Sequence, residues 1–497
     1  MNAVIGQLPV LLIVVPILGA FLILLAGKVR RAFAYPITLA TIGFQFAASL
    51  ILLSAVMTGG TIRYYVGGWP PPMGIELVLD AFNSFILVVI LALALLAAVW
   101  AREGAALDIP PEKTVSFFVV FQLLVTGLSG MTITGDLFNL YVFLEISSIA
   151  AYTLVASGRG ARALIAGFNY LILGSIAAGF IVLGIGYLYV ATGTLNMGEL
   201  AVMLPASYGL ATVHAAFLFL MIGFSIKVAF FPLHLWLPDA YTESPSVVTI
   251  LIATATSKVT AYAMIRVIFS VFTPQYITES FPVTEVILII AAIAIIAGAV
   301  LAIAQDNLKR MLAYSSISQM GYIMFAIGIA NQVALEGGLL HILAHAVMKG
   351  CLFMVAGMII YRTGITTINR LSGLSRTMPI ACAAFALAGA SMIGIPPTIG
   401  FMSKYYLVLG AVEAGEYLAA AVLLVGSLLA AVYIWRVIEL MYFGETHGSD
   451  LHTGREAPLS MIVPVLILAA SCLILGLSVD LLLEVISPAV TLLLGVN

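Results

Sequence analysis

The sequence predicts an all-α polytopic membrane protein with about fourteen transmembrane helices. Hydrophobic residues make up 63% of the 497 residues, charged residues make up only 8%, and the mean hydropathy is +1.18. A water-soluble surface normally carries about a quarter charged residues, so this chain has too few charges to cover a folded domain in water. Apolar stretches of about 20 residues, the length at which a helix crosses a bilayer, recur along the whole sequence.

The predicted spans are 8–27, 33–57, 78–100, 114–133, 137–157, 163–191, 211–236, 246–270, 283–304, 311–330, 338–361, 378–410, 417–442 and 459–479. No basic stretch precedes the first span, and Lys28, Arg30 and Arg31 follow it. This arrangement predicts a retained helix with its N-terminus outside and not a cleaved signal peptide.

Basic residues are distributed unevenly between the loops. The even-numbered loops contain only Arg63, whereas the odd-numbered loops contain Lys28, Arg30, Arg31, Arg102, Lys113, Arg159, Arg162, Lys309, Arg310, Arg362, Arg370, Arg376 and Arg455. By the positive-inside rule, the basic loops face the cytoplasm and both termini face outside. We therefore expect a multi-pass protein of the cell (inner) membrane, surrounded by the lipid bilayer.

Composition and cysteine spacing exclude several classes of function. The net charge of −2 provides no basic field for nucleic acid, so no nucleic-acid partner is expected. Cys351, Cys382 and Cys472 lie in separate apolar runs, without the C-x-x-C spacing typical of zinc or iron–sulfur sites. We expect this chain to carry no cofactor and no metal.

Six basic residues fall inside or beside the predicted spans: Lys227, Lys258, Arg266, Lys349, Lys404 and Arg436. Arg266 and Arg436 lie near span ends, where we expect their long side chains to snorkel to the interface. The four lysines lie deeper. A charge at the bilayer centre costs about 2.5–3.5 kcal/mol on insertion scales and normally lines a wet interior path. Glu145, within "LFNLYVFLEISSIAAY", belongs to the same set.

Glu145 and Lys227 are interpreted as a proton-handling pair. The alternative is a static buried ion pair that fixes helix packing. Burial disfavours the charged forms of both groups, and proximity of the two favours them, so a change in their separation would change their proton affinity. The number of further costly groups in the spans favours a proton path.

A stripe of ionisable residues occurs in "HILAHAVMKG" (341–350). His341, His345 and Lys349 are spaced i, i+4 and i+8, which places them on one face of a helix. Ile342 replaces the glutamate that a zinc protease of the H-E-x-x-H type needs. Haem or metal ligation and structural hydrogen bonding remain alternatives, and a proton relay is the favoured interpretation.

Two spans contain sequences that interrupt helices. In "FSIKVAFFPLHLWLPDAYTESPS", Pro232 follows Lys227. In "GASMIGIPPTIGFMSKYYLV", Lys404 is preceded by Gly394, Pro396, Pro397 and Gly400. Proline removes a backbone donor and clashes with the preceding turn. Broken helices in corresponding places of two halves indicate inverted repeats around a transport site, although two ordinary kinks are the alternative. His234, beside the first break, is a further candidate for proton transfer.

Five ordered motifs carry a resemblance to a known family: "GGWPPPMGIELVLDAFNSF" (68–86), "LFNLYVFLEISSIAAY" (137–152), "KVAFFPLHLWLPDAYTESPS" (227–246), "DNLKRMLAYSSISQMGY" (306–322) and "HILAHAVMKGCLFMVAG" (341–357). The chain resembles the antiporter-like subunits shared by Mrp-type cation/proton antiporters, respiratory complex I and membrane-bound hydrogenases. The resemblance implies fourteen helices and two inverted five-helix repeats with two broken helices. The implied units are an N-terminal segment (1–110), repeats at 111–271 and 282–442, and a C-terminal helix and tail (443–497).

The resemblance also implies roles for individual residues. The glutamate of the fifth helix and the lysine of the seventh, which form the family's proton-handling pair, correspond to Glu145 and Lys227. The eighth-helix lysine corresponds to Lys258, the eleventh-helix stripe to His341, His345 and Lys349, and the terminal ionisable residue of the twelfth helix to Lys404.

Among the family's members, the chain resembles best the D-type component of an Mrp-type antiporter. One complex I subunit has a glutamate at the position that corresponds to Lys404, and two other members have long C-terminal extensions that this sequence does not contain. This implies a secondary transporter subunit that exchanges protons for Na⁺ or another monovalent cation together with other membrane subunits. The alternative is a proton-pumping subunit of a redox complex, and a solitary membrane enzyme is disfavoured. Asp239 and Glu243 are interpreted as helix caps or solvated acids, with a cation site as the alternative.

Overall fold

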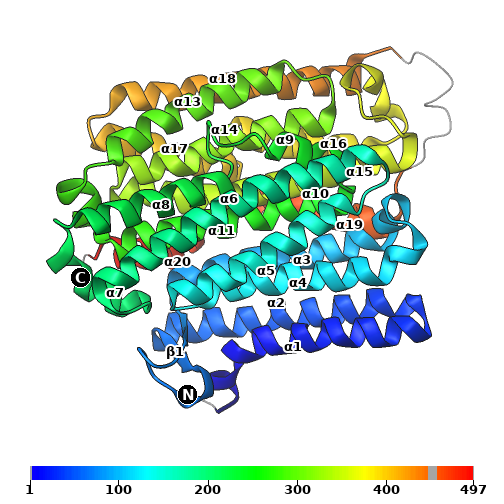
Figure 1. Ribbon diagram of the computed structural model, residues 1–497. Helices are drawn as coiled ribbons and strands as arrows, with labels where there is room; N and C mark the ends of the chain where they lie inside the picture. The colour runs from blue at the N-terminus through cyan, green and yellow to red at the C-terminus, as the bar shows by residue number, and fades with distance from the viewer. Residues whose placement is uncertain (1–2, 446–455, 496–497) are drawn as a thin grey trace.

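The computed structural model describes residues 3–445 and 456–495 and is almost entirely helical. Its long helices run side by side across Figure 1. The helices are α1 (Ala3–Val29), α2 (Ala34–Gly59), α3 (Ala81–Asp108), α4 (Thr114–Ile133), α5 (Leu137–Ala156), α6 (Ala161–Thr192), α7 (Met197–Met203), α8 (Ala211–Lys227), α9 (Leu237–Glu243), α10 (Ser246–Leu251), α11 (Ser257–Arg266), α12 (Thr273–Gln275), α13 (Thr284–Ile303), α14 (Leu308–Ile329), α15 (Gln332–Thr363), α16 (Pro379–Ile393), α17 (Ile399–Glu413), α18 (Tyr417–Phe443), α19 (Leu459–Leu477) and α20 (Val479–Leu494).

Twelve helical segments within residues 3–445 and 456–495 are long and apolar enough to cross a membrane, which confirms the all-α polytopic fold. The two other predicted spans, 211–236 and 378–410, are interrupted. In the first, α8 ends at Lys227 and the short α9 begins at Leu237, just beyond the predicted end; the second is divided into α16 and α17. A total of fourteen crossings stays a prediction. Arg455, one of the predicted basic loop residues, lies outside the described residues.

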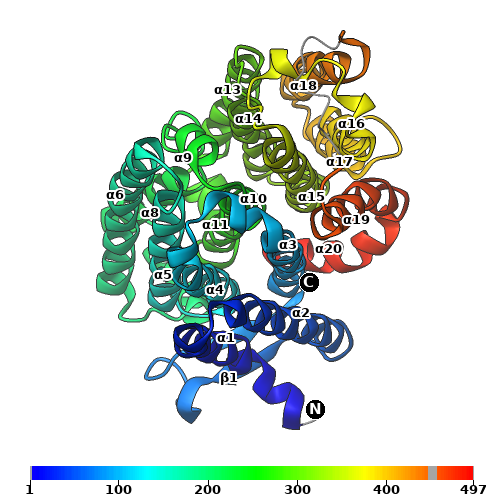
Figure 2. The same cartoon turned by 90° about the vertical axis from the view of Figure 1, so that its right-hand side faces the viewer.

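The predicted eighth span, 246–270, is not a uniform α-helix. Between α10 and α11 the chain forms a π-helical turn at Ile252–Thr256, and a second π-helical turn follows at Val267–Val271. Viewed from one end of the bundle, α10 and α11 lie near the centre, with α15 and α3 as neighbours (Figure 2). This central position explains why every residue of the span's most apolar window is buried.

One end of the bundle, which we call the hairpin end, carries a small β-hairpin that the sequence analysis did not predict. Strands β1 (Ile62–Tyr65) and β2 (Glu76–Leu79) pair antiparallel. The N-terminus, α7 and the C-terminal helix α20 lie toward the same end (Figure 1). Because successive spans alternate in direction, the odd-numbered loops with most of the basic residues lie at the opposite end, which we call the basic end.

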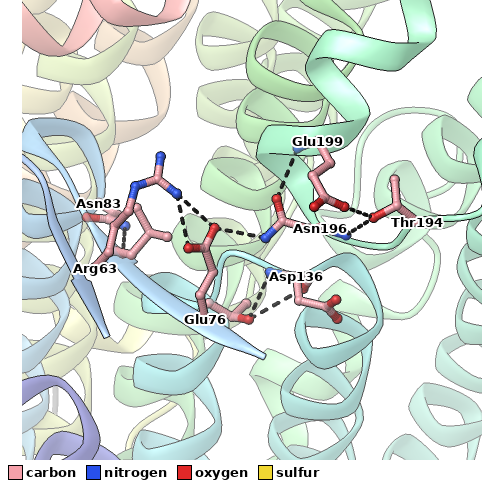
Figure 3. A network of polar contacts seen from close by, with 9 residues as sticks. Arg63, Glu76, Asn83, Asp136, Thr194, Asn196 and Glu199 are labelled. Carbon is pink, nitrogen blue, oxygen red and sulfur yellow. Dashed lines mark hydrogen bonds and ion pairs between the residues drawn. The ribbon is translucent and has the colours of Figure 1, made fainter. Parts of the chain in front are cut away.

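A polar network ties the hairpin to neighbouring loops (Figure 3). The Glu76 carboxylate accepts hydrogen bonds from Arg63 Nη1, at 2.9 and 3.0 Å, and from Asn196 Nδ2 at 2.8 Å. The backbone carbonyl of Glu76 also accepts a hydrogen bond from the Gly135 amide at 3.0 Å. Glu76 therefore joins the hairpin to the loops before α5 and α7.

Asp136 starts α5 beside this network. Its carboxylate accepts a hydrogen bond from the Asn139 amide at 2.7 Å, which is the geometry of a helix N-cap. Burial raises the pKa of the Asp136 carboxyl above its ordinary value, while the backbone amides that it accepts from oppose this shift.

The order of helix lengths occurs twice along the chain. Helices α4, α5 and α6 have 20, 20 and 32 residues and precede the broken α8–α9 span, and α13, α14 and α15 have 20, 22 and 32 residues and precede the broken α16–α17 span. Isolated antiparallel bridges join Asp136 to Asn196 and Asn307 to Thr367 at corresponding points. The first bridge lies at the hairpin end and the second at the basic end, as two repeats of opposite orientation would require. The inverted repeats and their boundaries at 111–271 and 282–442 stay a prediction.

Helices α6 and α8 approach closely through two glycines. A Cβ added at Gly223 of α8 would lie 2.7 Å from the Ala177 carbonyl oxygen of α6, and one added at Gly184 of α6 would lie 2.9 Å from the Ala216 carbonyl oxygen of α8. Small residues at such positions let membrane helices pack backbone against backbone. Helix α8 is therefore fixed against α6 over much of its length.

We expect Glu76→Ala to destabilise the protein by about 1–3 kcal/mol, because it leaves the buried Asn196 amide group and Arg63 without their acceptor. The measurement is the thermal unfolding midpoint of the purified protein in detergent. Glu103→Ala is the control. The Arg102–Glu103 pair is exposed with atoms 3.9 Å apart, so its loss should change stability by less than about 1 kcal/mol. Equal shifts in the two variants would contradict the proposed role of Glu76.

Candidate functional site

The first candidate group is located where helix α8 breaks. Lys227 is the last residue of α8, and the chain then leaves the helix, with Ala229 at a φ of 57°. Trp236 Nε1 donates a 2.7 Å hydrogen bond to the Ile226 carbonyl oxygen, which satisfies one acceptor at the broken end. Lys227 thus lies at the C-terminus of a helix, the end that carries partial negative charge.

Lys227 is also bound to one face of α5. Its Nζ lies 3.2 Å from Glu145 Oε1, 2.7 Å from Ser148 Oγ and 3.0 Å from the Tyr152 hydroxyl. The Lys227 side chain is 5% exposed, whereas that of Glu145 is 25% exposed. The expected contact between Glu145 and Lys227 is therefore present in the structure. Their role in proton transfer stays a prediction.

The second group is located at the break between α16 and α17. Gly394 ends α16 with a φ of 95°. Lys404, one turn into α17, reaches back to this end and donates to the carbonyl oxygens of Met392 at 2.8 Å and Ile393 at 3.1 Å, and to Ser427 Oγ at 3.0 Å. The Lys404 ammonium group thus lies at the C-terminus of the half-helix α16, although Lys404 itself belongs to α17 on the other side of the break. Lys227, in contrast, is the last residue of its own half-helix.

Lys258 occupies the centre of the bundle and is fully buried. It follows the π-helical turn Ile252–Thr256, and its Nζ donates to the Ala253 carbonyl oxygen and, at 3.3 Å, to Ser257 Oγ. No carboxylate within residues 3–445 and 456–495 forms an ion pair with it. The π-helical turn changes the backbone hydrogen-bond register and brings a carbonyl oxygen within reach of the lysine.

The predicted stripe on α15 is present and fully buried. His341 Nδ1 lies 3.0 Å from Ser403 Oγ, and its ring is stacked with that of His345 at a centroid distance of 6.2 Å. Lys349 Nζ donates to the Leu312 carbonyl oxygen at 2.7 Å and to Ser315 Oγ. The stripe therefore lies between α14, which holds Lys349, and α17, which carries Ser403 and Lys404.

Several fully buried polar atoms near this stripe have no hydrogen-bond partner among the residues that the structure describes. They are Thr256 Oγ1, both amide atoms of Gln319, His341 Nε2 and both ring nitrogens of His345. Buried polar groups normally bond to protein or to ordered water. These atoms can therefore accept or donate hydrogen bonds to small polar species between Lys258 and the stripe.

His234 lies in the break between α8 and α9 but does not bond to Lys227. Its ring is stacked on Phe231 at 5.1 Å and approaches the ring of Tyr314 on α14 at 6.5 Å. The structure therefore directs His234 toward the second half of the chain and away from the Glu145–Lys227 pair.

The short helix α9 is held by the start of α14. Arg310 Nη1 lies 2.9 Å from Asp239 Oδ1, and Lys309 Nζ donates to the Ser244 carbonyl oxygen at 2.7 Å. Lys309 was assigned to a loop from the sequence, but it lies in the first turn of α14, and only 5% of it is exposed. Asp239 lies inside α9 and is paired, so it serves as an anchor for the half-helix rather than as a cap.

The prediction that Arg266 snorkels to the interface was also wrong. Arg266 is 8% exposed and forms an ion pair with Asp80 at 2.7 Å, above the ring of Phe82. Asp80 caps α3 and supplies a buried partner, so the guanidinium does not need to reach water. Arg436 pairs with Asp306 at 2.9 Å at the basic end.

The neutral partners of the lysines and of His341 were not predicted from the sequence. Ser148 and Tyr152 follow Glu145 at i+3 and i+7, a spacing that places all three on one helix face, so this signal was available. The partners Ser403 and Ser315 carried no comparable signal. Among the described residues, no three His, Cys, Asp or Glu side chains come together closely enough to hold a metal ion.

Broken helices with buried lysines, connected by a polar stripe through the middle of the bundle, define an antiporter-like membrane subunit. The chain belongs to the NADH:quinone oxidoreductase/Mrp antiporter transmembrane family, whose model matches residues 134–430. Two of the three kinds of relative that the resemblance named, the oxidoreductase and the Mrp-type antiporter, are found.

The chain is 43% identical over 491 residues to the N-type component of the NADH-quinone oxidoreductase of Desulforudis audaxviator, with 95% of this chain and 96% of that protein covered. It is 30% identical over 477 residues to the D-type component of the Na(+)/H(+) antiporter of Bacillus subtilis, with 95% and 94% covered. The higher of these two identities belongs to the oxidoreductase, so they do not single out the antiporter component that the sequence analysis favoured.

Two solved structures share the fold over nearly the whole chain. A chain of the Mrp complex from Dietzia sp. DQ12-45-1b superposes with a TM-score of 0.90 at 27% identity and covers 99% of this chain and 98% of its own length. A chain of the membrane-bound sulfane sulfur reductase (MBS), an archaeal respiratory membrane complex, superposes with a TM-score of 0.91 at 29% identity, with 98% of each chain covered.

We expect Gly394→Ala to be more destabilising than Gly415→Ala. Both glycines have positive φ, 95° and 78°, so each alanine introduces backbone strain of about 1–2 kcal/mol. Only at Gly394 would the new Cβ crowd Lys404, at 3.2 Å from its Cδ, whereas Gly415 faces open space. The measurement is the thermal unfolding midpoint of each variant, and equal midpoints would contradict a tight fit around Lys404.

Proposed function

We propose that this chain is a proton-translocating subunit of a multisubunit membrane complex. The observation that supports this most directly is the contact between Lys227 and Glu145. Lys227 lies at the broken end of a half-helix, and Glu145 is partly exposed on the outer face of α5. The pair combines a titratable donor with a titratable acceptor in a membrane, where such groups normally mark an ion pathway.

The pair would act as a switch. When Glu145 is close, its charge stabilises the protonated form of Lys227. When the carboxylate is neutralised or turns away, the lysine loses that stabilisation and releases its proton to the interior. Ser148 and Tyr152 would keep the amine oriented in both states, since their hydroxyls accept hydrogen bonds from the ammonium and one of them could donate to the lone pair of the neutral amine.

The proposed route continues from Lys227 to Lys258, then to His345, His341 and Lys349, and ends at Lys404. Proton transfer needs hydrogen-bond distance or an intervening water. The unpartnered atoms of Thr256, Gln319 and the two histidines supply positions where water would bind between Lys258 and Lys404. His234 is proposed as a side branch toward Tyr314 on α14. Structural hydrogen bonding remains the competing role for the histidines.

The complex would couple proton flow either to a cation or to redox chemistry. We propose a monovalent cation (Na⁺)/proton antiporter, in line with the B. subtilis relative and with the lysine at position 404. A proton-pumping subunit of a redox complex is the second candidate, and the 43% identity to an oxidoreductase subunit favours it. In both cases the chain would bind other membrane subunits, as the Mrp and MBS assemblies suggest.

Proteoliposomes that contain the purified complex would separate the two candidates. A pH-sensitive dye inside the vesicles should respond to added Na⁺, K⁺ or Li⁺, but not to choline, if the complex is an antiporter. A response that requires an electron donor and acceptor, with no response to the cations, would identify the redox complex instead.

We propose the cell membrane as the location, with the basic end in the cytoplasm and both termini outside.

Glu145→Gln should abolish proton transport while the complex still assembles. The glutamine keeps the size of the side chain and can accept a hydrogen bond from Lys227, but it removes the charge on which the switch depends. Proton uptake into proteoliposomes and the subunit composition after size-exclusion chromatography are the two measurements. Glu413→Gln, at an exposed position at the end of α17, is the control and should transport normally. Normal transport by Glu145→Gln would rule out the proposed switch.

Lys404→Arg should assemble and unfold at nearly the normal temperature, because a guanidinium can still donate to the carbonyl oxygens of Met392 and Ile393. It should nevertheless fail to transport protons, since arginine keeps its proton at any relevant pH. Lys404→Ala should lose both transport and stability. If Lys404→Arg transports at the normal rate, a fixed positive charge is sufficient there and the residue is a helix cap only.

A further inference from the structure

A groove of about 520 Å³ lies between α4, α5 and α6 in the half of the bundle that adjoins the basic end. Most of its lining is apolar and includes Phe117 of α4, Ile149 of α5 and Phe168 of α6. The side chains of Ile149 and Phe168 are 59% and 62% exposed in this chain. The volume falls within the range of about 300–1,000 Å³ that is typical of small-ligand sites.

The depth of the groove matches one leaflet of a bilayer. Its lining on α5 runs from Ile149 to Ser157, which at 1.5 Å per residue corresponds to about 12 Å along the helix axis. Half of the hydrocarbon core of a bilayer is about 15 Å thick. An occupant would therefore extend from the basic end toward the middle of the membrane without crossing it.

A positive charge lies at the outer end of the groove. Lys113, which precedes α4, is exposed and lines the groove directly. Arg159 lies in the loop between α5 and α6 and Arg162 in the first turn of α6; both are exposed but, like Glu112, are not part of the lining. No carboxylate among the described residues lines the groove. The groove thus combines one cationic residue at its rim with an apolar interior.

We propose that this groove binds an anionic phospholipid, with one acyl chain between α4, α5 and α6 and the phosphate on Lys113. The charge distribution favours an amphiphile with a negative head over a transmembrane helix of a partner, which would bury the Lys113 ammonium in an apolar contact. An acyl chain in the groove would also pack against Tyr152, which lines it and whose hydroxyl lies 3.0 Å from Lys227 Nζ. The lipid would then support the face of α5 that holds the lysine.

The test uses the purified complex reconstituted with phosphatidylglycerol that carries a photoreactive diazirine in its acyl chain, followed by peptide mapping of the crosslinks. We expect crosslinks on the groove residues of α5 and α6, with phosphatidylcholine of the same acyl chains giving several-fold fewer. One lysine near a membrane surface contributes about 1 kcal/mol to anionic lipid binding, so Lys113→Gln should weaken labelling about five-fold. Thr153→Trp, an exposed position in the lining, should block labelling by filling the groove.

Arg376→Gln is the matched control. It removes the same charge from an exposed residue before α16, on the far side of the bundle from α4, α5 and α6 (Figure 2), and it should leave the groove crosslinks unchanged. Equal labelling by phosphatidylglycerol and phosphatidylcholine would reduce the groove to a non-specific lipid contact and overturn the proposal. Crosslinks in the isolated chain that disappear in the assembled complex would show that a partner subunit covers the groove, which would also overturn it.

Discussion

The structure depends on lysine residues that lie where two helices break inside the membrane, at the C-termini of half-helices. A helix that stops inside a membrane leaves carbonyl oxygens without partners, and no lipid group can satisfy them. Lys404 donates to the last carbonyl oxygens of α16, and Lys227 is itself the final residue of α8. At α16 the broken helix end places partial negative charge beside a buried cation, and Lys404 supplies the hydrogen-bond donor that this end lacks. At α8 the donor to the broken end is Trp236, while the Lys227 ammonium bonds to α5.

The same principle extends to the centre of the bundle, where Lys258 and Lys349 donate to the carbonyl oxygens of Ala253 and Leu312. Of the four membrane-buried lysines, Lys227 is the one that also contacts a carboxylate within the described chain. Backbone carbonyls hold their partial charge at every pH, whereas Glu145 can gain or lose its charge. The interaction that can respond to a proton is therefore located at one end of the row of lysines.

Sequence reasoning located most of the spans, both breaks and the four membrane-buried lysines, because hydropathy, proline and isolated charges are local signals. Apart from the Glu145–Lys227 pair, which the family resemblance implied, it did not locate the partners, since most of these come from distant parts of the chain. Arg266 and Asp80 are 186 positions apart, and nothing in either segment specifies the other. The π-helical turn before Lys258 and the β-hairpin likewise depend on packing against neighbours, whereas the face that carries Glu145, Ser148 and Tyr152 is visible in their spacing.

The glycine contact between α6 and α8 limits how the Glu145–Lys227 pair could change. Backbone lies against backbone at Gly184 and Gly223, so α8 has little room to move relative to α6. In the proposed switch, the distance between the two charged groups would then change through rotation about side-chain bonds rather than through helix movements, which take microseconds to milliseconds. The proposed switch would not have to wait for a helix to move.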